Sequence, residues 1–209
     1  MAVDFNCYVL GGDMIIFEDM GQKVGKHILK NQWFLDNGIQ VMRVPLPIGD
    51  YAIANDRSMD VLERKEKREN KPKKLDFLGT YYAAVDTKES IGEIINNICG
   101  KSHGRFKDEC VLAQNNKVQL YVLVENEDGV TCIEDLERWQ NPRLQRYEKI
   151  KEMHSLGKWS SVRLPKKPPT AGSTLAKAML TMQKEYGVRF LFCAPWEAGE
   201  KVLALLEGK

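Results

Sequence analysis

The sequence lacks any apolar run that approaches the roughly 20 residues of a membrane-spanning helix. Its first six residues have neither the basic cluster nor the long apolar stretch of a secretory signal. The five cysteines, at positions 7, 99, 110, 132 and 193, are odd in number and form no CxxC pair, which argues against a disulfide framework and against a zinc site. We therefore expect a cytoplasmic protein with reduced, mostly buried thiols and no membrane partner.

A large net charge is also missing. The 31 Lys and Arg residues against 29 Asp and Glu residues leave +2, so overall charge does not predict a nucleic-acid partner. Basic residues do gather locally: residues 63–74 hold seven of them against three acidic ones, and residues 101–107 and 163–167 form two smaller clusters. One charge run by itself usually marks solvated surface. Three runs around a site for phosphate chemistry favour contact with a nucleic-acid backbone.

Two apolar, strand-like runs end in charged residues. Asp50 closes the first run, and Asp86 with Lys88 closes the second, which begins at residue 81. Because strand side chains alternate between faces, Asp86 and Lys88 lie on the same face. Two carboxylates and an ammonium at the end of a sheet can hold a hard divalent cation beside a phosphate. The pattern therefore predicts a metal-dependent phosphodiesterase, and we interpret the chain first as a nuclease.

Periodicity predicts an α/β fold with a mixed sheet flanked by helices. We expect strands at residues 14–17, 39–44, 48–54, 81–88 and 118–124, and helices at 23–37, 90–99 and 104–114. The helix at 23–37 is expected to bury Val24, Ile28, Trp33 and Leu35. Residues 55–79 are polar and lysine-rich and are predicted to be a mobile insertion loop. We assign residues 1–126 to a core domain.

Residues 127–209 are expected to form a C-terminal extension packed on the core. Thr131 with Glu134 can cap a short helix, and Asn141 before Pro142 predicts a second one, reaching about residue 155. A loop at 157–173, a helix at 174–186, a strand at 188–193 and a last helix near 197–207 complete the expected order.

In this order the chain resembles the XPF-type nuclease domain of the PD-(D/E)XK superfamily. The residues that carry the resemblance are Gly49-Asp50-Tyr51, Val85-Asp86-Thr87-Lys88, the helix at 89–98, Gly104-Arg105-Phe106, Glu109-Cys110 and the strand at 120–125. They cover about residues 14–126 and imply a restriction-endonuclease-like fold. The extension, with its segment 186–190, is similar to compact single-domain members encoded by phages and prophages.

The resemblance also implies roles for individual residues. Asp50 and Asp86 would bind Mg²⁺ or Mn²⁺ with the help of the Thr87 carbonyl, and Lys88 would orient or deprotonate the attacking water or stabilise the transition state. Glu18 matches an additional catalytic and metal-binding acid, and its neighbour Asp19 is a possible substitute. Contacts to DNA phosphates are expected from His103, Arg105, Lys107, Lys23 and Lys26.

Two departures from the family pattern leave alternatives open. Relatives usually carry Glu-Arg-Lys about ten residues after Gly-Asp, and Glu63-Arg64-Lys65 stands close to that spacing. We prefer Asp86 and Lys88, because Glu63 lies in alternating charge without a strand pattern. Where the family has Asp-x-Arg-Glu, this chain has Glu18-Asp19-Met20-Gly21, and no tandem helix-hairpin-helix module is evident. Taken singly, Asp50 is a plausible turn residue, Asp86 a surface acid and His27 an ordinary helix residue.

We therefore expect a Mg-dependent endonuclease acting on branched, flapped or otherwise structured DNA, in repair, recombination or phage DNA processing. One alternative is a DNA-binding or assembly module that has kept the fold and lost catalysis. Another is a restriction-like nuclease that reads base sequence. A homodimer is an expectation by analogy with relatives.

Overall fold

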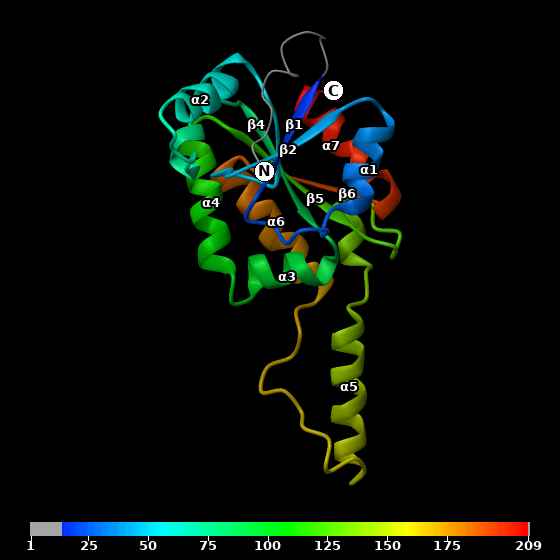
Figure 1. Cartoon of the computed structure of the whole chain (residues 1–209). Coiled ribbons are helices and arrows are strands. Elements are labelled where there is room, and N and C mark those ends of the chain that lie inside the picture. Colours follow the sequence, from blue (N-terminus) through cyan, green and yellow to red (C-terminus); the bar gives the residue numbers. More distant parts are fainter. Residues whose placement is uncertain (1–13, 209) are drawn as a thin grey trace.

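Six strands form one mixed sheet in the computed structural model, which describes residues 14–208 (Figure 1). They are β1 (Ile15–Asp19), β2 (Gln40–Val44), β3 (Tyr51–Ile53), β4 (Ala83–Lys88), β5 (Gln119–Glu125) and β6 (Arg189–Cys193). Their order is β2-β1-β3-β4-β5-β6, with β3 antiparallel to both neighbours and every other pair parallel. The predicted mixed α/β fold is confirmed. The expectations for Cys7 and for the chain start concern residues outside this range.

Helices cover both faces of the sheet (Figure 1). One face is covered by α1 (Ile28–Asp36) and α7 (Ala198–Glu207), and the other by α3 (Ile91–Cys99), α4 (His103–Asn115) and α6 (Gly172–Tyr186). In β5, Leu123 belongs to the core on the α1/α7 side of the sheet, and Val122 and Val124 belong to the core on the α3/α4/α6 side. This strand is therefore buried on both faces, as its continuous apolar run indicates.

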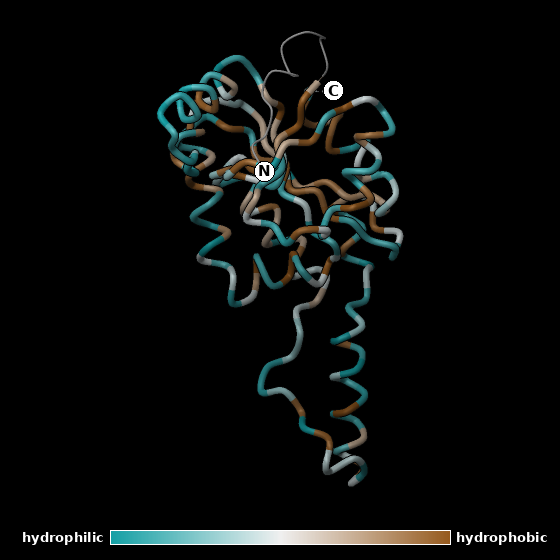
Figure 2. The backbone as a smooth tube through the Cα atoms, in the orientation of Figure 1, coloured by the Kyte–Doolittle hydropathy of each residue, from teal (hydrophilic) through white to brown (hydrophobic). Residues whose placement is uncertain are grey.

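Parallel pairing of β6 with β5 makes the C-terminal strand an edge of the main sheet. Between these strands the chain forms η3 (Glu134–Glu137) and α5 (Pro142–Ser155), and η4 (Pro195–Glu197) follows β6. The side chain of Asn141 accepts a hydrogen bond from Arg143 N, so the predicted cap of α5 is confirmed. Helix α5 projects away from the rest of the molecule (Figure 1), and hydrophilic residues dominate it (Figure 2).

The prediction of a mobile loop at 55–79 is wrong. This segment contains α2 (Asp56–Lys67) and η2 (Lys74–Phe77). Asn55 starts α2 with a reciprocal capping box: its side chain accepts from Ser58 N at 3.1 Å, and Ser58 Oγ accepts from Asn55 N at 2.9 Å. Val61, Leu62 and Phe77 are buried in the core. Because charged residues outnumber these few apolar ones in the segment, the sequence shows no clear helical pattern there.

The predicted helix at 23–37 begins later and buries a different face. It starts at Ile28, and Ile28 and Leu35 are exposed. The buried positions are Lys30 and Phe34, with His27 just before the first turn. His27 and Lys30 are buried because each has a buried acidic partner, Glu18 and Glu125 respectively. A pattern of hydrophobic residues cannot predict such polar contacts.

The structure bears on the expectations about membrane helices and about the thiols. No helix within residues 14–208 has both the length and the apolar character to cross a bilayer. The four described cysteines are free thiols; Cys110 and Cys193 are buried, Cys132 is partly buried and Cys99 is exposed.

Candidate active site

A cavity of about 490 Å³ opens where β1 and β4 end. It is lined by Asp19, Gln22, Leu46, Pro47, Gly49, Asp50, Lys74, Asp86, Lys88, Arg105, Asp108, Glu109 and Leu112. Five of the residues selected from the sequence thus surround one space: Asp19, Asp50, Asp86, Lys88 and Arg105. They come from β1, β4, α4 and the turn before β3, segments far apart in the sequence.

Asp86 and Lys88 form a tight buried pair on the same face of β4. Lys88 Nζ lies 2.7 Å from Asp86 Oδ1 and 2.6 Å from Asp86 Oδ2, and it stands 5.9 Å from the centre of the Phe106 ring. Only the Oδ1 contact has hydrogen-bond geometry, so Asp86 Oδ2 is buried without a hydrogen-bond partner. This oxygen is therefore paired with the Lys88 ammonium by charge alone, and it has no hydrogen bond that a second cation in the cavity would have to displace.

The two groups of this pair are shifted in pKa in ways that suit a cation site. Burial raises the pKa of Asp86 well above its ordinary value, and repulsion from Asp50 and Glu109 adds to this against the attraction of Lys88. Burial alone would lower the pKa of Lys88, but the charges of Asp86 and Asp50 outweigh it, so this pKa is raised. Lys88 is therefore an ammonium at neutral pH.

Asp50 is held by backbone geometry and by β4. Its Oδ2 accepts hydrogen bonds from Thr87 N at 2.9 Å and from Thr87 Oγ1 at 2.8 Å, and its Oδ1 accepts one from Gln22. Gly49, directly before it, has φ +73°, and a Cβ there would lie 2.9 Å from Ala84 Cβ. A glycine is thus needed where the chain passes close over β4 and turns Asp50 into the cavity.

Gly49→Ala is expected to lower the free energy of unfolding by about 2 kcal/mol or more, because it combines a left-handed conformation with a steric clash. Chemical denaturation would measure this. Gly79→Ala is the matched control: Gly79 has φ +74°, and a Cβ added there would meet nothing within 4 Å, so it reports the conformational strain alone. Equal losses in the two variants would show that the close approach to β4 is unimportant.

Glu109 carries part of the sequence resemblance but was given no role at the site. Its Oε1 accepts a hydrogen bond from Gly49 N at 2.8 Å, which ties α4 to the turn that carries Asp50. Burial raises the pKa of Glu109, with a further contribution from Asp50. The available signal was its spacing: Glu109 follows Arg105 by four residues, so both lie on one face of α4 and line the same cavity.

The raised pKa of Glu109 predicts a pH dependence for the metal-free protein. Its pKa is higher in the folded than in the unfolded state, so between these values the folded state binds more protons and the free energy of unfolding falls as the pH rises. Glu109→Gln keeps an acceptor for Gly49 N and removes the titration. In EDTA, wild type should lose stability relative to this variant from about pH 4 upward. Urea denaturation from pH 4 to 8 measures the difference; a constant difference would contradict the expectation.

Glu18 and Asp19 point to opposite faces of β1, and the structure separates their surroundings. Asp19 faces the cavity: its Oδ1 accepts from Leu46 N at 3.0 Å, and Lys74 Nζ lies 3.0 Å from its Oδ2. Glu18 does not line the cavity. The assignment of Glu18 as the acid at this cavity is not matched by the structure, and its neighbour Asp19 occupies that place.

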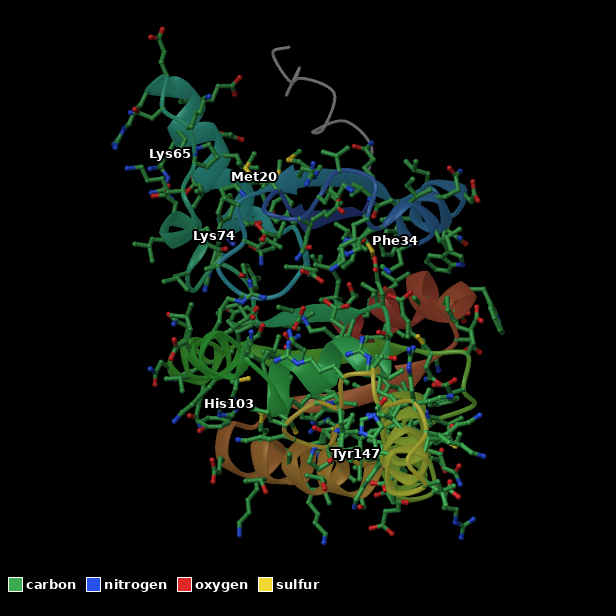
Figure 3. All side chains as sticks on the ribbon, turned by 90° about the horizontal axis from the view of Figure 1, so that it is seen from below. Met20, Phe34, Lys65, Lys74, His103 and Tyr147 are labelled. Atoms are coloured by element: carbon green, nitrogen blue, oxygen red, sulfur yellow. The ribbon has the colours of Figure 1, made fainter. Side chains whose placement is uncertain are left out.

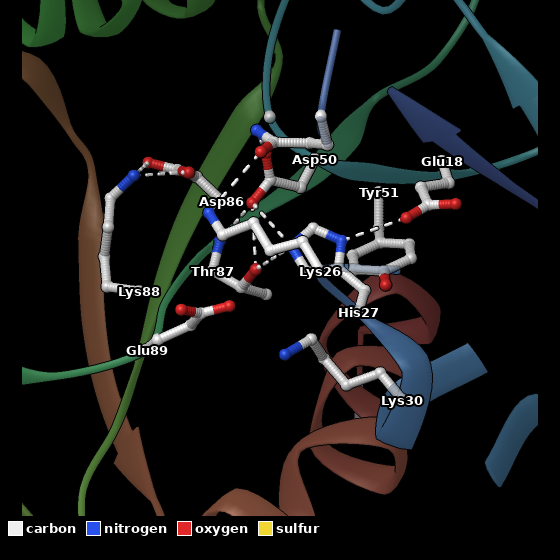
Figure 4. A network of polar contacts seen from close by, with 12 residues as sticks. Glu18, Lys26, His27, Lys30, Asp50, Tyr51, Asp86, Thr87, Lys88 and Glu89 are labelled. Atoms are coloured by element: carbon white, nitrogen blue, oxygen red, sulfur yellow. Dashed lines mark hydrogen bonds and ion pairs between the residues drawn. The ribbon is translucent and has the colours of Figure 1, made fainter. Parts of the chain in front are cut away.

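Behind the sheet, Glu18 belongs to a buried polar network (Figure 4). Its Oε1 lies 3.1 Å from His27 Nδ1, and His27 Nε2 lies 3.3 Å from the Thr87 Oγ1 that donates to Asp50. Burial is the largest influence and would raise the pKa of Glu18, but the hydrogen bond and charge of His27, together with Asn31 and Arg43, outweigh it, so the pKa is lowered. The interpretation of His27 as an ordinary helix residue is wrong: it connects Glu18 to the support of Asp50.

The cations selected as DNA contacts are distributed unevenly. Arg105 lines the cavity, whereas His103 and Lys107 are exposed on α4 and outside its lining. Figure 3 shows where His103 lies. Lys23 is exposed in the turn before α1, and Lys26 Nζ lies 3.4 Å from Oε1 of the cavity residue Gln22. Lys74, from the segment expected to be a loop, also lines the cavity.

The alternative pair, Glu63 and Lys65, lies in α2 and outside this cavity. Glu63 is exposed and its Oε2 is 3.7 Å from Lys67 Nζ, whereas Lys65 Nζ is 2.8 Å from Asp76 Oδ1. Figure 3 shows Lys65 at the outer end of this part of the molecule, beyond Lys74. Neither residue faces Asp50, so the geometry favours Asp86 and Lys88.

A divalent cation fits the donor set of the cavity. Within residues 14–208 no three His, Cys, Asp or Glu side chains form a ready-made metal cluster. Asp50 and Asp86 nevertheless present carboxylate oxygens to one space, and Asp86 Oδ2 has no hydrogen bond to lose. Carboxylate oxygens are the ligands that Mg²⁺ and Mn²⁺ prefer. The pair therefore suits a hard cation supplemented by other oxygen ligands.

Among solved structures, the fold is similar to XPF from Aeropyrum pernix. The match has a TM-score of 0.50 and 14% sequence identity, and it covers 92% of this chain and 60% of that one. A second structure, XPF from Aeropyrum pernix in complex with DNA, matches with a TM-score of 0.49 and 15% identity over 92% of this chain and 63% of that one. The chain thus spans about three fifths of the length of these proteins. The expected XPF nuclease-like fold is confirmed.

At the level of sequence, no curated protein is a significant match. The sequence model of the ERCC4 domain, by contrast, matches residues 19–206, which include β1 to β6 apart from the first residues of β1. Neither finding supports a phage or prophage origin. The match includes all the residues that line the cavity, among them Asp19, Asp50, Asp86, Lys88 and Glu109. Because it spans most of the chain, this protein belongs to the ERCC4 domain family, whose nucleases the residue pattern resembled.

Proposed function

We propose that this protein is a Mg- or Mn-dependent endonuclease that hydrolyses phosphodiester bonds in branched or flapped DNA. The observation that carries the proposal is the meeting of two carboxylates, Asp50 and Asp86, with the Lys88 ammonium in one cavity. Membership of the ERCC4 domain family supports the same activity. The proposed setting is DNA repair or recombination.

Asp50, Asp86 and Lys88 each have a part in the proposed reaction. The bound cation would supply Lewis-acid activation of water and neutralise phosphate charge. Asp50 and Asp86 would hold it, and the Asp50 carboxylate is kept in place by Thr87. Lys88 remains protonated because Asp86 raises its pKa, so it is suited to stabilise negative charge developing on the phosphate rather than to remove a proton.

The proposed DNA specificity rests on backbone contacts. Arg105 and Lys74 stand at the cavity and can pair with phosphates on either side of the scissile bond. Such contacts carry no base information, so the preference is expected to follow the shape of the DNA instead of its sequence.

A second candidate is a DNA-binding or assembly module without catalysis. Two observations favour it: Lys88 already neutralises Asp86, and residues 20 and 21 are Met and Gly where relatives have other side chains. Under this alternative the cavity would bind DNA, and no divalent cation would change the integrity of the strand.

The test is a cleavage assay on end-labelled single-stranded, duplex, flap, fork and four-way-junction DNA with Mg²⁺, Mn²⁺ or EDTA. We expect cutting of one or more branched substrates that requires the metal. Binding without cutting on all five substrates would exclude the nuclease and leave the binding module. Cutting of plain duplex at fixed sequences would instead identify a sequence-specific nuclease.

A further inference from the structure

Residues 142–170 form an arm that consists of α5 and an irregular segment that returns beside it (Figure 1). The arm follows β5 and η3, so it leaves the molecule at the carboxyl end of the sheet. Asp86 and Lys88 stand at the same end, on the neighbouring strand β4, which runs parallel to β5. The arm and the cavity therefore lie toward one end of the sheet.

The net charge of the arm is more positive than that of the whole protein. Residues 142–167 contain eight of the 31 Lys and Arg residues and only two of the 29 Asp and Glu residues, so this segment carries +6 and the remainder of the chain carries −4. Within the described residues, none of these eight cations forms an ion pair with a carboxylate. This charge is available to an external polyanion.

Specific contacts give the arm a defined shape. At its root, Asn141 Nδ2 donates to Thr170 O at 2.7 Å, which joins the outgoing and returning segments. At its tip, Lys158 N donates to Met153 O at 2.8 Å, and Lys149 Nζ lies 5.8 Å from the centre of the Trp159 ring. Ile150 is buried, whereas the cations are exposed. The exposed surface of the arm therefore displays all eight cations, with Leu156 and Trp159 also exposed near the tip.

A second cavity, of about 520 Å³, connects the root of the arm to α3. Arg143 and Lys167 line it from the arm, and Ser90 and Ile91 line it from the first turn of α3. Ser90 is two residues from Lys88 in the chain. Basic side chains thus extend from the arm to the segment that directly follows the candidate catalytic lysine.

We propose that the arm binds the phosphate backbone of a duplex segment of the DNA substrate, away from the bond that is cut. This inference rests on the proposed DNA-directed function and adds a second contact surface to it. Duplex DNA carries about one charge per 1.7 Å, and unpaired Lys and Arg side chains bind it by releasing condensed counterions. The polar outer surface and the +6 charge match this partner better than an apolar protein groove.

The test compares DNA binding by a six-fold arm variant with binding by wild type. The variant is Arg143→Gln, Arg146→Gln, Lys149→Gln, Arg163→Gln, Lys166→Gln and Lys167→Gln. Fluorescence anisotropy in EDTA, where no metal-dependent cutting occurs, uses flap DNA with duplex segments of 10 or 30 base pairs at several salt concentrations. We expect about a 10- to 100-fold weaker affinity for the longer DNA and a shallower dependence of log K on log salt, by roughly three units or more.

Two control proteins separate arm contacts from general effects. Lys177→Gln, Lys184→Gln and Lys201→Gln remove exposed charges from α6 and α7, and Arg143→Lys, Arg146→Lys and Arg163→Lys keep the charge of the arm. Both should bind within about threefold of wild type. Circular dichroism and thermal melting verify folding.

The outcomes are distinct. If the six-fold variant binds both DNA lengths as the α6/α7 control does, the inference is overturned. The same holds if the variant keeps DNA affinity but changes from dimer to monomer in sedimentation velocity, which would make the arm a protein interface. Arm-dependent binding by a wild type that cuts none of the five substrates would support the arm and refute the nuclease. Cutting without arm dependence would do the reverse.

Discussion

Replacing Asp86 with alanine is expected to lower the rate of Mg-dependent cleavage by at least about 10²- to 10³-fold, the loss typical of removing one electrostatic contact to a transition state. The substitution removes one of the two carboxylates placed to hold the cation and also the partner that fixes Lys88 at 2.7 Å. Single-turnover cleavage of the preferred branched substrate measures the effect. DNA affinity in EDTA should change by less than about threefold.

Two variants make this expectation decisive. Glu63→Ala removes the alternative acid, which is exposed in α2, and should cut like wild type. Loss of cutting in Glu63→Ala with activity kept in Asp86→Ala would move the active site away from the cavity. Asp86→Asn keeps the size of the side chain and removes its charge, so cleavage should be lost without a cavity at the site. Because the amide leaves the buried Lys88 ammonium without its carboxylate, urea denaturation in EDTA measures what the pair contributes to stability.

The central part of the site could be predicted because it is encoded over short stretches of sequence. Asp86 and Lys88 are two residues apart at the end of an apolar run, and the two-residue period of a strand places them on one face. The isoleucine helix after them and the Gly-Asp turn are equally local signals. Pairing of β3 between β1 and β4 then brings Asp50 beside Asp86, which the resemblance to XPF-type nucleases implied.

Glu18 and Asp19 show where local patterns stop being sufficient. Adjacent residues on a strand face opposite sides, so the choice between them depends on the exact register of β1. Glu18 pairs with Arg43 and Asp19 pairs with Val44 in the sheet, and only the second of the two acids reaches the cavity. Both acids can be identified in the sequence. Which of them faces the cavity depends on how β1 pairs with its neighbouring strands, and this pairing is set by the tertiary structure.

Buried polar partners explain the errors on the N-terminal side. His27 and Lys30 belong to the buried side of α1 because their partners lie on other elements, Glu18 on β1 and Glu125 on β5. The distance between Lys30 and Glu125 along the chain is 95 residues. Hydrophobic periodicity assigns Lys30 to the solvent side of the helix. It therefore predicts that Ile28 and Leu35 are buried, whereas both are exposed.

Lys30→Met is expected to lower the free energy of unfolding by about 3–5 kcal/mol, because it leaves the buried Glu125 carboxylate without its ammonium partner. Only 4% of the Lys30 residue and 6% of the Glu125 residue are exposed, so water cannot replace the lost contact. The methionine keeps most of the lysine's volume, so a cavity does not account for the loss. Urea denaturation followed by tryptophan fluorescence measures it.

The double variant Lys30→Met with Glu125→Leu tests the cause. Replacing both partners of a buried ion pair by apolar side chains is often neutral or stabilising, so the double variant should recover most of the loss. Lys201→Met, at an exposed position of α7, should change stability by no more than about 0.5 kcal/mol. If the double variant is as unstable as Lys30→Met, the unpaired Glu125 carboxylate is not the cause of the loss, and the buried ion pair does not set the orientation of α1.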